Sequence, residues 1–490
     1  MRMKIVLFDS KINDAQKDFA GGMGVGMHSG SGGFRGRVIR FFYMRDRRPV
    51  ALNFAYLSAI FKRLGHDVEY ALDRSAEGDI YLFNPALLTL EHEIRQAELI
   101  RARSPKAQLW WTGSVVFGLK DVLVERLSNL NGKILIGEPE MLMTEFDRVY
   151  HSQESVIDLG ALQDLDQLPF PDWSPFGHNK FKIRYDFWRF PTAYIQQSRG
   201  CTFKCNYCPY IMIENKTRLR DPESVVAEIQ HGIDAYGFRS FKFRDPLFGL
   251  DRKRVLRVAE GIAALSTKIQ FSIETRIDLM RDETLLALKR AGLTSITVGI
   301  ETPNEEMLRK YQRAPIKDDR QRDFILRCRE LGIRTVAGFM VGFPEDTAEN
   351  ILWVLNYARK LNPTYANFNV VTPYPGTGFH QAVRDQIASH NFADYSVYQP
   401  VMRYKHLSAD QVKELHAKCF TKFYFRSRYF RDNAALLWPR YRSLLQRLLP
   451  IHAPATDQVG SNRSPNLETN SQQALKQINP TACDSPRKVA

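Results

Sequence analysis

The sequence predicts an α/β protein in which a doubly wound parallel sheet is followed by a partial (β/α)6 barrel and a C-terminal helical segment. Three observations support this prediction. Apolar stretches of strand length alternate with amphipathic stretches of helix length in two separate regions, a pattern typical of parallel sheets. A proline-containing segment at 159–176 separates these regions. The 490 residues also exceed what one hydrophobic core usually supports.

The first region of alternation predicts the doubly wound sheet. Its apolar stretches predict strands at 3–8, 67–71, 80–83, 108–111 and 133–136, and its helical patterns lie at 50–64, 90–103 and 121–127. A glycine-rich stretch at 21–36 predicts a long loop. Its glycines do not form the G-x-G-x-x-G fingerprint of dinucleotide-binding proteins.

The second region predicts the barrel. The predicted strands are 193–197, 240–243, 269–274, 295–300, 334–341 and 366–372, and the predicted helices are 222–236, 252–265, 283–291, 318–331 and 347–361. In a parallel barrel the functional residues gather at the carboxyl ends of the strands. Asp245, just after one predicted strand, is a candidate polar residue of the site and equally a candidate cap for the next helix.

We therefore expect five parts along the chain. They are a doubly wound domain at 1–150, a linker at 151–190, the barrel at 191–395, a helical region at 396–450 and a disordered tail at 451–490. The tail is rich in Asn, Ser, Gln, Pro and Thr, which bury too little apolar surface to offset the entropy of ordering.

A net charge of +15 predicts an anionic partner, such as nucleic acid, a phosphorylated substrate or a membrane surface. The excess is concentrated at 34–48 and 418–447. The second stretch interleaves aromatic, leucine and arginine residues, which suits a helix lying on an anionic membrane or an ordinary amphipathic helix with its cations outward. No apolar run reaches membrane-spanning length and the start has no secretory pattern, so we expect a cytoplasmic protein, with peripheral membrane contact as one reading of this stretch.

Three of the six cysteines form the strongest motif. Cys201, Cys205 and Cys208 follow a predicted strand with the spacing C-x3-C-x2-C. Three thiolates on one loop can bind three irons of a [4Fe-4S] cluster and leave the fourth iron open. A structural zinc site would need a fourth ligand, and neither a second cysteine pair nor a histidine pair lies nearby. Three unrelated buried cysteines are the remaining alternative.

The cysteine motif resembles that of the radical S-adenosylmethionine (SAM) superfamily. The resemblance implies that SAM binds the open iron and that Tyr207 lies near its adenine. Three later segments, FSIETRID, VGIET and GFMVGFP, resemble further motifs of the family in the same order. They imply contacts with SAM from Arg276 to its carboxylate, from Gly299 and Glu301 near its ribose, and from Gly342 along its adenine.

The domain order resembles the radical SAM proteins that carry an N-terminal Rossmann-like, cobalamin-binding domain. GEPE at 137–140, DLDQLPFPDW, RDPLFGLDRKR and TPYPGTGF support this resemblance, and Thr112, Gly113 and Ser114 match a cofactor-facing strand end. The D-x-H-x-x-G motif that often supplies a cobalt ligand is absent, and His28, His66 and His92 lack its flanking residues. The domain therefore either binds cobalamin without a histidine ligand or has lost the cofactor and only covers the mouth of the barrel.

The resemblance implies an enzyme that cleaves SAM to a 5′-deoxyadenosyl radical, with an electron donor such as flavodoxin or ferredoxin. Cobalamin-dependent methyl transfer to an unactivated carbon of a small-molecule or lipid-like substrate is the leading expectation. A cobalamin-independent cyclase, dehydratase or oxidoreductase is the alternative. A tRNA-modifying enzyme or a non-enzymatic adaptor is a more distant one, because the sequence shows neither a second cysteine cluster nor an RNA-binding barrel.

Overall fold

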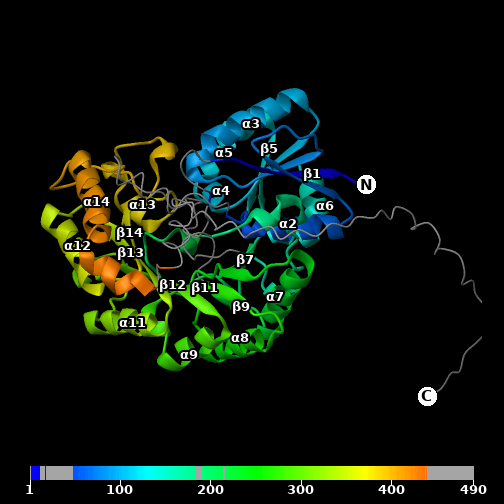
Figure 1. Cartoon of the computed structure of the whole chain (residues 1–490). Coiled ribbons are helices and arrows are strands. Elements are labelled where there is room, and N and C mark those ends of the chain that lie inside the picture. The colour runs from blue at the N-terminus through cyan, green and yellow to red at the C-terminus, as the bar shows by residue number, and fades with distance from the viewer. Residues whose placement is uncertain are drawn as a thin grey trace, which may run out of the picture. The chain divides into compact units, whose positions relative to one another are not determined.

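The computed structural model describes residues 2–11, 17, 48–183, 190–212, 216–435 and 438, which all belong to one compact unit, Met1–Arg440. The predicted glycine-rich loop, the first basic cluster up to Arg47 and the predicted tail lie outside the described residues. Two six-stranded parallel sheets form the framework, and helices cover them (Figure 1). The predicted fold class is confirmed.

The first sheet has the strand order β2-β1-β3-β4-β5-β6. Its strands are β1 (Lys4–Asp9), β2 (Asp67–Leu72), β3 (Ile80–Phe83), β4 (Gln108–Trp111), β5 (Gly132–Ile136) and β6 (Val156–Asp158). The chain moves from β1 to one side and then returns past it to β3, so the carboxyl ends of β1 and β3 mark a topological switch point. In open parallel sheets, ligands bind in the crevice at such a point.

Helices cover both faces of the first sheet. They are α2 (Leu52–Arg63), α3 (Leu90–Arg103), α4 (Ser114–Gly118), α5 (Lys120–Leu127) and α6 (Leu142–His151). Alternate strand residues point to opposite faces. Trp111 belongs to the core formed with α3, α4 and α5, whereas Trp110 packs 5.5 Å from the ring of Phe146 in α6. α6 and β6 were not among the predicted elements; a three-residue strand such as β6 gives no usable periodicity.

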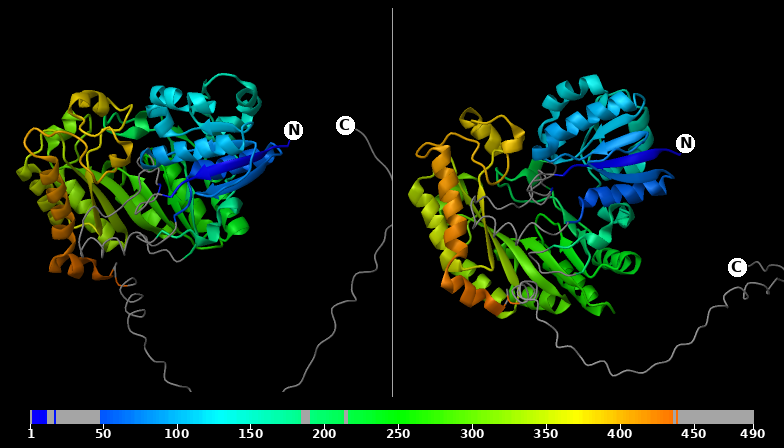
Figure 2. Two further views of the ribbon diagram at one scale, coloured as in Figure 1. Left: turned by 90° about the horizontal axis from the view of Figure 1, so that it is seen from above. Right: turned by 45° about the horizontal axis from the view of Figure 1, so that its top comes forward.

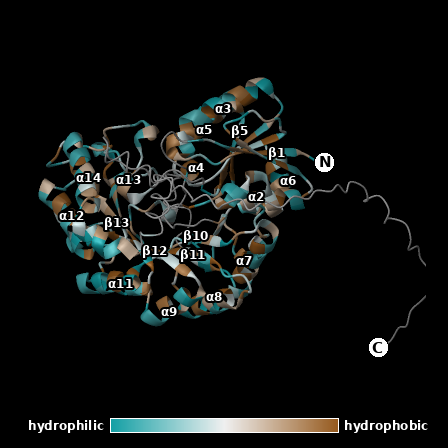
Figure 3. Ribbon diagram, viewed as in Figure 1, coloured by the Kyte–Doolittle hydropathy of each residue, from teal (hydrophilic) through white to brown (hydrophobic). Residues whose placement is uncertain are grey.

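The second sheet keeps its strands in chain order, β7-β10-β11-β12-β13-β14. Its strands are β7 (Thr192–Ile195), β10 (Ser240–Phe243), β11 (Gln270–Thr275), β12 (Leu293–Glu301), β13 (Arg334–Val341) and β14 (Tyr365–Val370). The helices between them are α7 (Pro222–Tyr236), α8 (Arg252–Ala264), α9 (Asp282–Ala291), α10 (Glu305–Lys310), α11 (Asp318–Glu330) and α12 (Ala348–Leu361). The long helices of this region lie on the outer side of the sheet (Figure 2). Their hydropathy is divided between hydrophilic and hydrophobic sides, as expected for helices packed on a core (Figure 3).

Smaller elements complete the fold. Two-residue strands β8 (Ser198–Arg199) and β9 (Arg218–Leu219) form an antiparallel ribbon, and helices α13 (Gly378–Ala382) and α14 (Ala409–Tyr424) follow the second sheet. Short 3-10 helices are η2 (Leu87–Thr89), η3 (Ser128–Leu130), η4 (Pro139–Met141), η5 (Leu165–Gln167), η6 (Ser174–Phe176), η7 (His178–Lys180), η9 (Pro209–Met212), η10 (Ile277–Leu279), η11 (Arg384–Gln386) and η12 (Phe392–Asp394). No helix among the described residues is both long and apolar enough to cross a bilayer.

The two sheets share a continuous hydrophobic core. Tyr395, Val401 and Met402, which follow the second sheet in the chain, belong to the same buried cluster as Phe83 and Leu90 of the first. The segment that links the two sheets is also packed. It buries Trp173, whose ring lies 5.9 Å from that of Phe238 in the second region. The first sheet is thus held against the barrel by apolar contacts from both ends of the second region.

Candidate functional site

The predicted site residues converge at the carboxyl edge of the second sheet. The cysteine loop follows β7 and β8, Arg276 follows β11, Glu301 ends β12 and Gly342 follows β13. Since these strands are parallel neighbours, the residues that follow them share one edge of the sheet. The structure therefore brings together residues that lie more than 140 positions apart in the chain.

The cysteine loop places three thiols within a compact, partly buried turn. The Cys208 amide donates to the Cys205 carbonyl at 3.0 Å, and Cys205 is buried while the other two thiols are half-buried. Gly200, at φ +78°, begins the loop, and a Cβ there would clash with the backbone of Lys216. Burial raises the pKa of the Cys208 thiol to about 12, and the neighbouring Cys205 adds to this shift.

The thiol arrangement fits a [4Fe-4S] cluster. Three nearby thiolates repel one another in a buried loop, so they need a cationic metal group to compensate them. No three His, Cys, Asp or Glu side chains of the described residues gather around a single ion position. In a cubane each thiolate binds a different iron, so its ligands need not share one ion position.

Arg276 lies against the cysteine loop, with its guanidinium carbon 4.3 Å from the centre of the Phe203 ring. Its Nε and Nη2 donate to the carboxylate of Asp278 at 3.0 and 2.9 Å. Its Nη1 is buried and has no hydrogen-bond partner. Arg276, which was predicted to bind the SAM carboxylate, therefore keeps one unsatisfied donor at the site. Its Nε and Nη2 are already occupied by Asp278.

A second buried arginine, Arg313, was not found by the sequence analysis. Its Nη1 lies 3.9 Å from the Cys205 sulfur, and its Nη2 donates to the Gly299 carbonyl at 2.6 Å and lies 3.2 Å from Glu301. Burial lowers the pKa of Arg313, but the Glu301 carboxylate and the groups around it outweigh burial and raise it above its usual value. The residue follows α10 and belongs to none of the strand-end motifs, so only the tertiary structure reveals it.

Glu301 itself has an unusual backbone, with φ +67°. A non-glycine residue in the left-handed region costs about 1 to 3 kcal/mol and is typical of functional sites. Its carboxylate lies so close to Gly299 that a Cβ at that glycine would clash with it. The two residues predicted to lie near the SAM ribose are therefore in contact, and Arg313 holds both.

Tyr207 and Gly342 lie at the same edge. The Tyr207 hydroxyl is buried without a hydrogen-bond partner. Burial, and then Glu301, raise the pKa of Tyr207 well above its usual value. The Gly342 amide, in a backbone at φ +76°, donates to Asp346 at 2.8 Å. The unsatisfied hydroxyl of Tyr207 is available to a ligand at this edge.

Asp245 has a positioning role in the structure. Its carboxylate accepts from the Gln197 amide at 3.1 Å and from the Ser198 hydroxyl at 2.5 Å. The cap of α8 is instead Asp251, whose side chain accepts from the Arg254 amide. Asp245 therefore fixes the chain between β7 and the cysteine loop. Burial raises the pKa of Asp245 to about 7.

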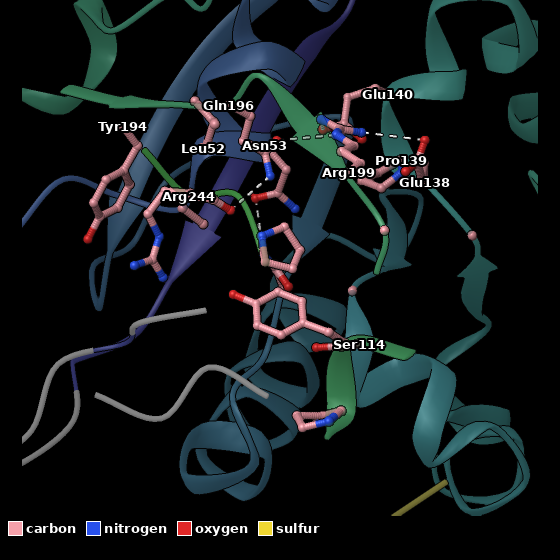
Figure 4. Close-up of a pocket in the computed structure, with 18 of the residues that line it drawn as sticks. Leu52, Asn53, Ser114, Glu138, Pro139, Glu140, Tyr194, Gln196, Arg199 and Arg244 are labelled. Carbon is pink, nitrogen blue, oxygen red and sulfur yellow. Dashed lines mark hydrogen bonds and ion pairs between the residues drawn. The ribbon is translucent and has the colours of Figure 1, made fainter. Parts of the chain in front are cut away.

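A pocket lies between the carboxyl ends of both sheets (Figure 4). The first sheet contributes the residues after β3, β4 and β5, and the second contributes residues after β7 and β10. Asn84 Oδ1 in its wall is buried without a hydrogen-bond partner, and Asn53 and Gln196 add further amides. Gly200 lines the same pocket, so its wall adjoins the cysteine loop.

The described lining of this pocket contains no histidine. His66 packs against Phe146, with ring centres 4.6 Å apart, and His92 pairs with Asp73 at 2.8 Å. His28 lies outside the described residues. Of Thr112, Gly113 and Ser114, which were predicted to face a cofactor, Gly113 and Ser114 line the pocket and Thr112 is fully buried beside them.

The radical SAM superfamily model matches residues 195–358. An uncharacterized methyltransferase of Pyrococcus horikoshii is 26% identical over 54% of this chain and 57% of its own length. An anaerobic magnesium-protoporphyrin IX monomethyl ester cyclase of Cereibacter sphaeroides is 28% identical over 55% of this chain and 44% of its own length. The chain spans about half the length of the curated relatives it matches.

Solved structures match more of the chain. The cobalamin-dependent SAM radical enzyme OxsB, with aqua-cobalamin and SAM bound, has a TM-score of 0.63 at 12% identity, over 92% of this chain and 75% of that one. The radical SAM methyltransferase TsrM of Kitasatospora setae, with cobalamin and a [4Fe-4S] cluster bound, has a TM-score of 0.58 at 14% identity, over 86% and 82%. At these identities the likeness shows the fold, and it extends over both sheets. Residues 195–358 thus match the radical SAM superfamily model, and both sheets together have the fold of these two cobalamin-binding radical SAM enzymes.

Proposed function

We propose that this chain is a radical SAM enzyme that transfers a methyl group to a carbon atom in a cobalamin-dependent reaction. The observation that carries the proposal is the pocket between the carboxyl ends of the two sheets, which adjoins the cysteine loop through Gly200. This arrangement would bring a ligand of the first sheet next to a radical source on the second. Proximity of two reacting groups lowers the entropic cost of their reaction.

Cys201, Cys205 and Cys208 would ligate the cluster and leave one iron for SAM. When bound, such a cluster supplies the single electron that cleaves SAM to methionine and a 5′-deoxyadenosyl radical. Arg313 and the free Nη1 of Arg276 would hold the SAM carboxylate, because both lie beside the loop as buried cationic donors. Glu301 and Gly299 would contact the ribose, and Tyr207 and Gly342 the adenine.

The pocket fits cobalamin by its chemistry. A corrin ring is large, apolar in its faces and bordered by amide groups, and the pocket offers the amides of Asn53, Asn84 and Gln196. The unpartnered Asn84 oxygen can accept from a ligand amide. Because the described lining contains no histidine, we propose that cobalt takes no histidine ligand from it. When bound, cobalamin supplies a carrier for the methyl group.

The alternative is a radical cyclase or oxidoreductase that needs no cobalt. It is supported by the 28% and 29% sequence identity to two anaerobic magnesium-protoporphyrin IX monomethyl ester cyclases. Binding of cobalamin separates the two proposals. The protein would be purified without oxygen, reconstituted with iron and sulfide, and offered hydroxocobalamin before gel filtration. The proposal predicts about four irons and four sulfides per chain and a retained corrin absorbance. It also predicts 5′-deoxyadenosine after reduction with dithionite or flavodoxin. Iron without retained corrin would favour the alternative, and absence of iron would refute both.

For the substrate we propose a lipid-like molecule reached from a membrane surface. Near α14 the exposed cations Lys418, Lys422, Arg428 and Arg431 accompany three exposed aromatic side chains, Phe425, Phe430 and Trp438. Aromatic anchors with surrounding cations suit an anionic bilayer interface. Cosedimentation with vesicles of phosphatidylcholine, with and without phosphatidylserine, tests this. We expect the protein to sediment only with the vesicles that contain phosphatidylserine, and we expect salt to weaken this binding. If the protein sediments with neither kind of vesicle, the membrane proposal is contradicted.

A further inference from the structure

The β8-β9 ribbon closes the base of the cysteine loop. Arg199 in β8 pairs directly with Arg218 in β9, and Cys201 follows Arg199 by two residues. The two side chains are only 11% and 6% exposed. Like charges opposite each other in an antiparallel pair are destabilising, and burial strengthens their repulsion. The ribbon is therefore unfavourable by itself.

The charges that compensate it come from the other sheet. Glu138 and Glu140 lie in the turn after β5, within the sequence GEPE. Arg218 Nη2 lies 2.7 Å from Glu138, and Arg199 Nη2 lies 2.8 Å from Glu140. Arg199 Nη1 also reaches Glu138 at 3.4 Å. Burial raises the pKa of Glu138, but Arg199 and Arg218 outweigh it, so the pKa lies below its usual value and the carboxylate stays charged.

The linker between the sheets is tied to the same group of charges. The Leu162 amide donates to Glu138 at 2.9 Å, and Arg218 donates to the Leu162 carbonyl. Glu138, Glu140, Arg199 and Arg218 also line the pocket. The same four side chains thus form the wall of the pocket and the base of the cysteine loop.

We infer that the GEPE turn of the first sheet is a positioning element for the cysteine loop: Glu138 and Glu140 hold the Arg199–Arg218 ribbon closed, so that the loop keeps its cluster-binding form only while the first sheet is docked. This inference rests on the cluster ligation in the proposed function. It also means that a ligand in the pocket contacts the side chains that order the loop. The first sheet then acts on the cluster site as well as on its own ligand.

The test compares Glu138→Gln/Glu140→Gln with the parent, because glutamine keeps the volume and removes both charges. In cluster-free protein, amide hydrogen exchange of 196–222 should be faster in the variant while exchange in β12 and β13 is unchanged. After reconstitution, chelator should remove iron on the order of tenfold faster, as expected when buried cations lose their partners. The electron paramagnetic resonance spectrum of the reduced cluster should respond less to SAM.

Two further variants separate positioning from general instability. Replacing both arginines as well, in Glu138→Gln/Glu140→Gln/Arg199→Gln/Arg218→Gln, removes the repulsion and should restore much of the protection of the ribbon. Glu91→Gln breaks the Glu91–Arg126 ion pair of the first sheet's helices, 2.5 Å long, and should leave iron loss unchanged. If the double variant does not fold, the single Glu140→Gln variant takes its place.

Unchanged exchange and iron loss in a folded charge-removal variant would overturn the inference while leaving the proposed function intact. Absence of iron from the parent protein after reconstitution would instead refute the proposed function. Loss of protection throughout both sheets, equal to that in 196–222, would also overturn the inference, since it would show a role in general stability.

Discussion

The two parallel sheets have the same number of strands but different strand orders. The second sheet adds each strand beside the previous one, from β7 through β14, with its long helices on the outer side. In the first sheet the chain passes from β1 to β2 on one side and then returns to β3 on the other side of β1, so its helices fall on both faces. The second sheet therefore presents its site residues along one carboxyl edge, and the first presents a crevice at its switch point.

The difference shows how two sites are brought together. Both sheets place polar residues after the carboxyl ends of their strands, and the pocket of Figure 4 is lined from both edges. Neither sheet alone encloses this pocket. The second sheet supplies the proposed sulfur ligands, whereas the first supplies amides and the carboxylates that reach the ribbon. Variants that disable one edge at a time can test this division of roles.

The largest effect is expected from the triple variant Cys201→Ala/Cys205→Ala/Cys208→Ala. It should lose all bound iron and all SAM cleavage, because the three thiolates are the proposed ligands of three of the four irons. Iron analysis and 5′-deoxyadenosine measurement check this. Cys328→Ala and Cys419→Ala, at buried cysteines of α11 and α14, are the matched controls and should keep the cluster. Iron retained in the triple variant would refute the assignment of the cluster.

The first sheet's edge can be blocked separately with Ser114→Trp. Ser114 is buried in the pocket wall at the start of α4, so a large ring there should exclude cobalamin while iron content stays unchanged. Corrin absorbance after gel filtration measures the outcome. Ser128→Trp, at an exposed position of the same region, is the control. Equal corrin retention in both variants would place the cofactor elsewhere.

The two arginines beside the cysteine loop should differ in their importance for SAM. Arg313→Met should weaken SAM binding about 10- to 100-fold, because a hydrogen bond to a charged group contributes roughly 1.5 to 3 kcal/mol. Arg276→Met should weaken it less, since Arg276 has only Nη1 left for a ligand, whereas Arg313 Nη1 lies 3.9 Å from the Cys205 sulfur. Calorimetric titration of the reconstituted proteins measures both affinities, with iron content as the check on the cluster. A larger loss at Arg276 would reverse the assignment.

The last expected effect concerns pH and stability rather than ligand binding. The pKa of Asp245 is raised to about 7 in the folded protein, against about 3.9 in an unfolded chain. A raised pKa stabilises the fold below about pH 4, and this contribution is lost as the pH rises to about 7. The free energy of unfolding should therefore fall over this range by up to about 4 kcal/mol more in the parent than in Asp245→Asn. Urea midpoints at several pH values measure it. If the free energy of unfolding depends on pH in the same way in the parent and in Asp245→Asn, burial does not raise the pKa of Asp245.

Much of the fold was predictable because its signals are local. The predicted helix 222–236 and strands 240–243 and 334–341 match α7, β10 and β13 to the residue. Each of these elements is defined either by an apolar periodicity long enough to recognise or by clear cap residues at its ends. The ribbon of β8 and β9 was missed, since two-residue strands carry no pattern and their pairing spans a loop.

The sequence by itself determined the three-cysteine motif, the two alternations of strand and helix and the strand ends at which the site residues lie. Each of these features depends on the spacing of residues within a short stretch of chain. The geometry of a helix, strand or loop then fixes where those residues lie relative to one another. Only the tertiary structure decided that Arg313 reaches Cys205, that Asp245 holds Ser198 and that Glu138 and Glu140 neutralise Arg199 and Arg218. These contacts join residues that lie 47 to 108 positions apart in the chain, and burial of charge, not local periodicity, selects them.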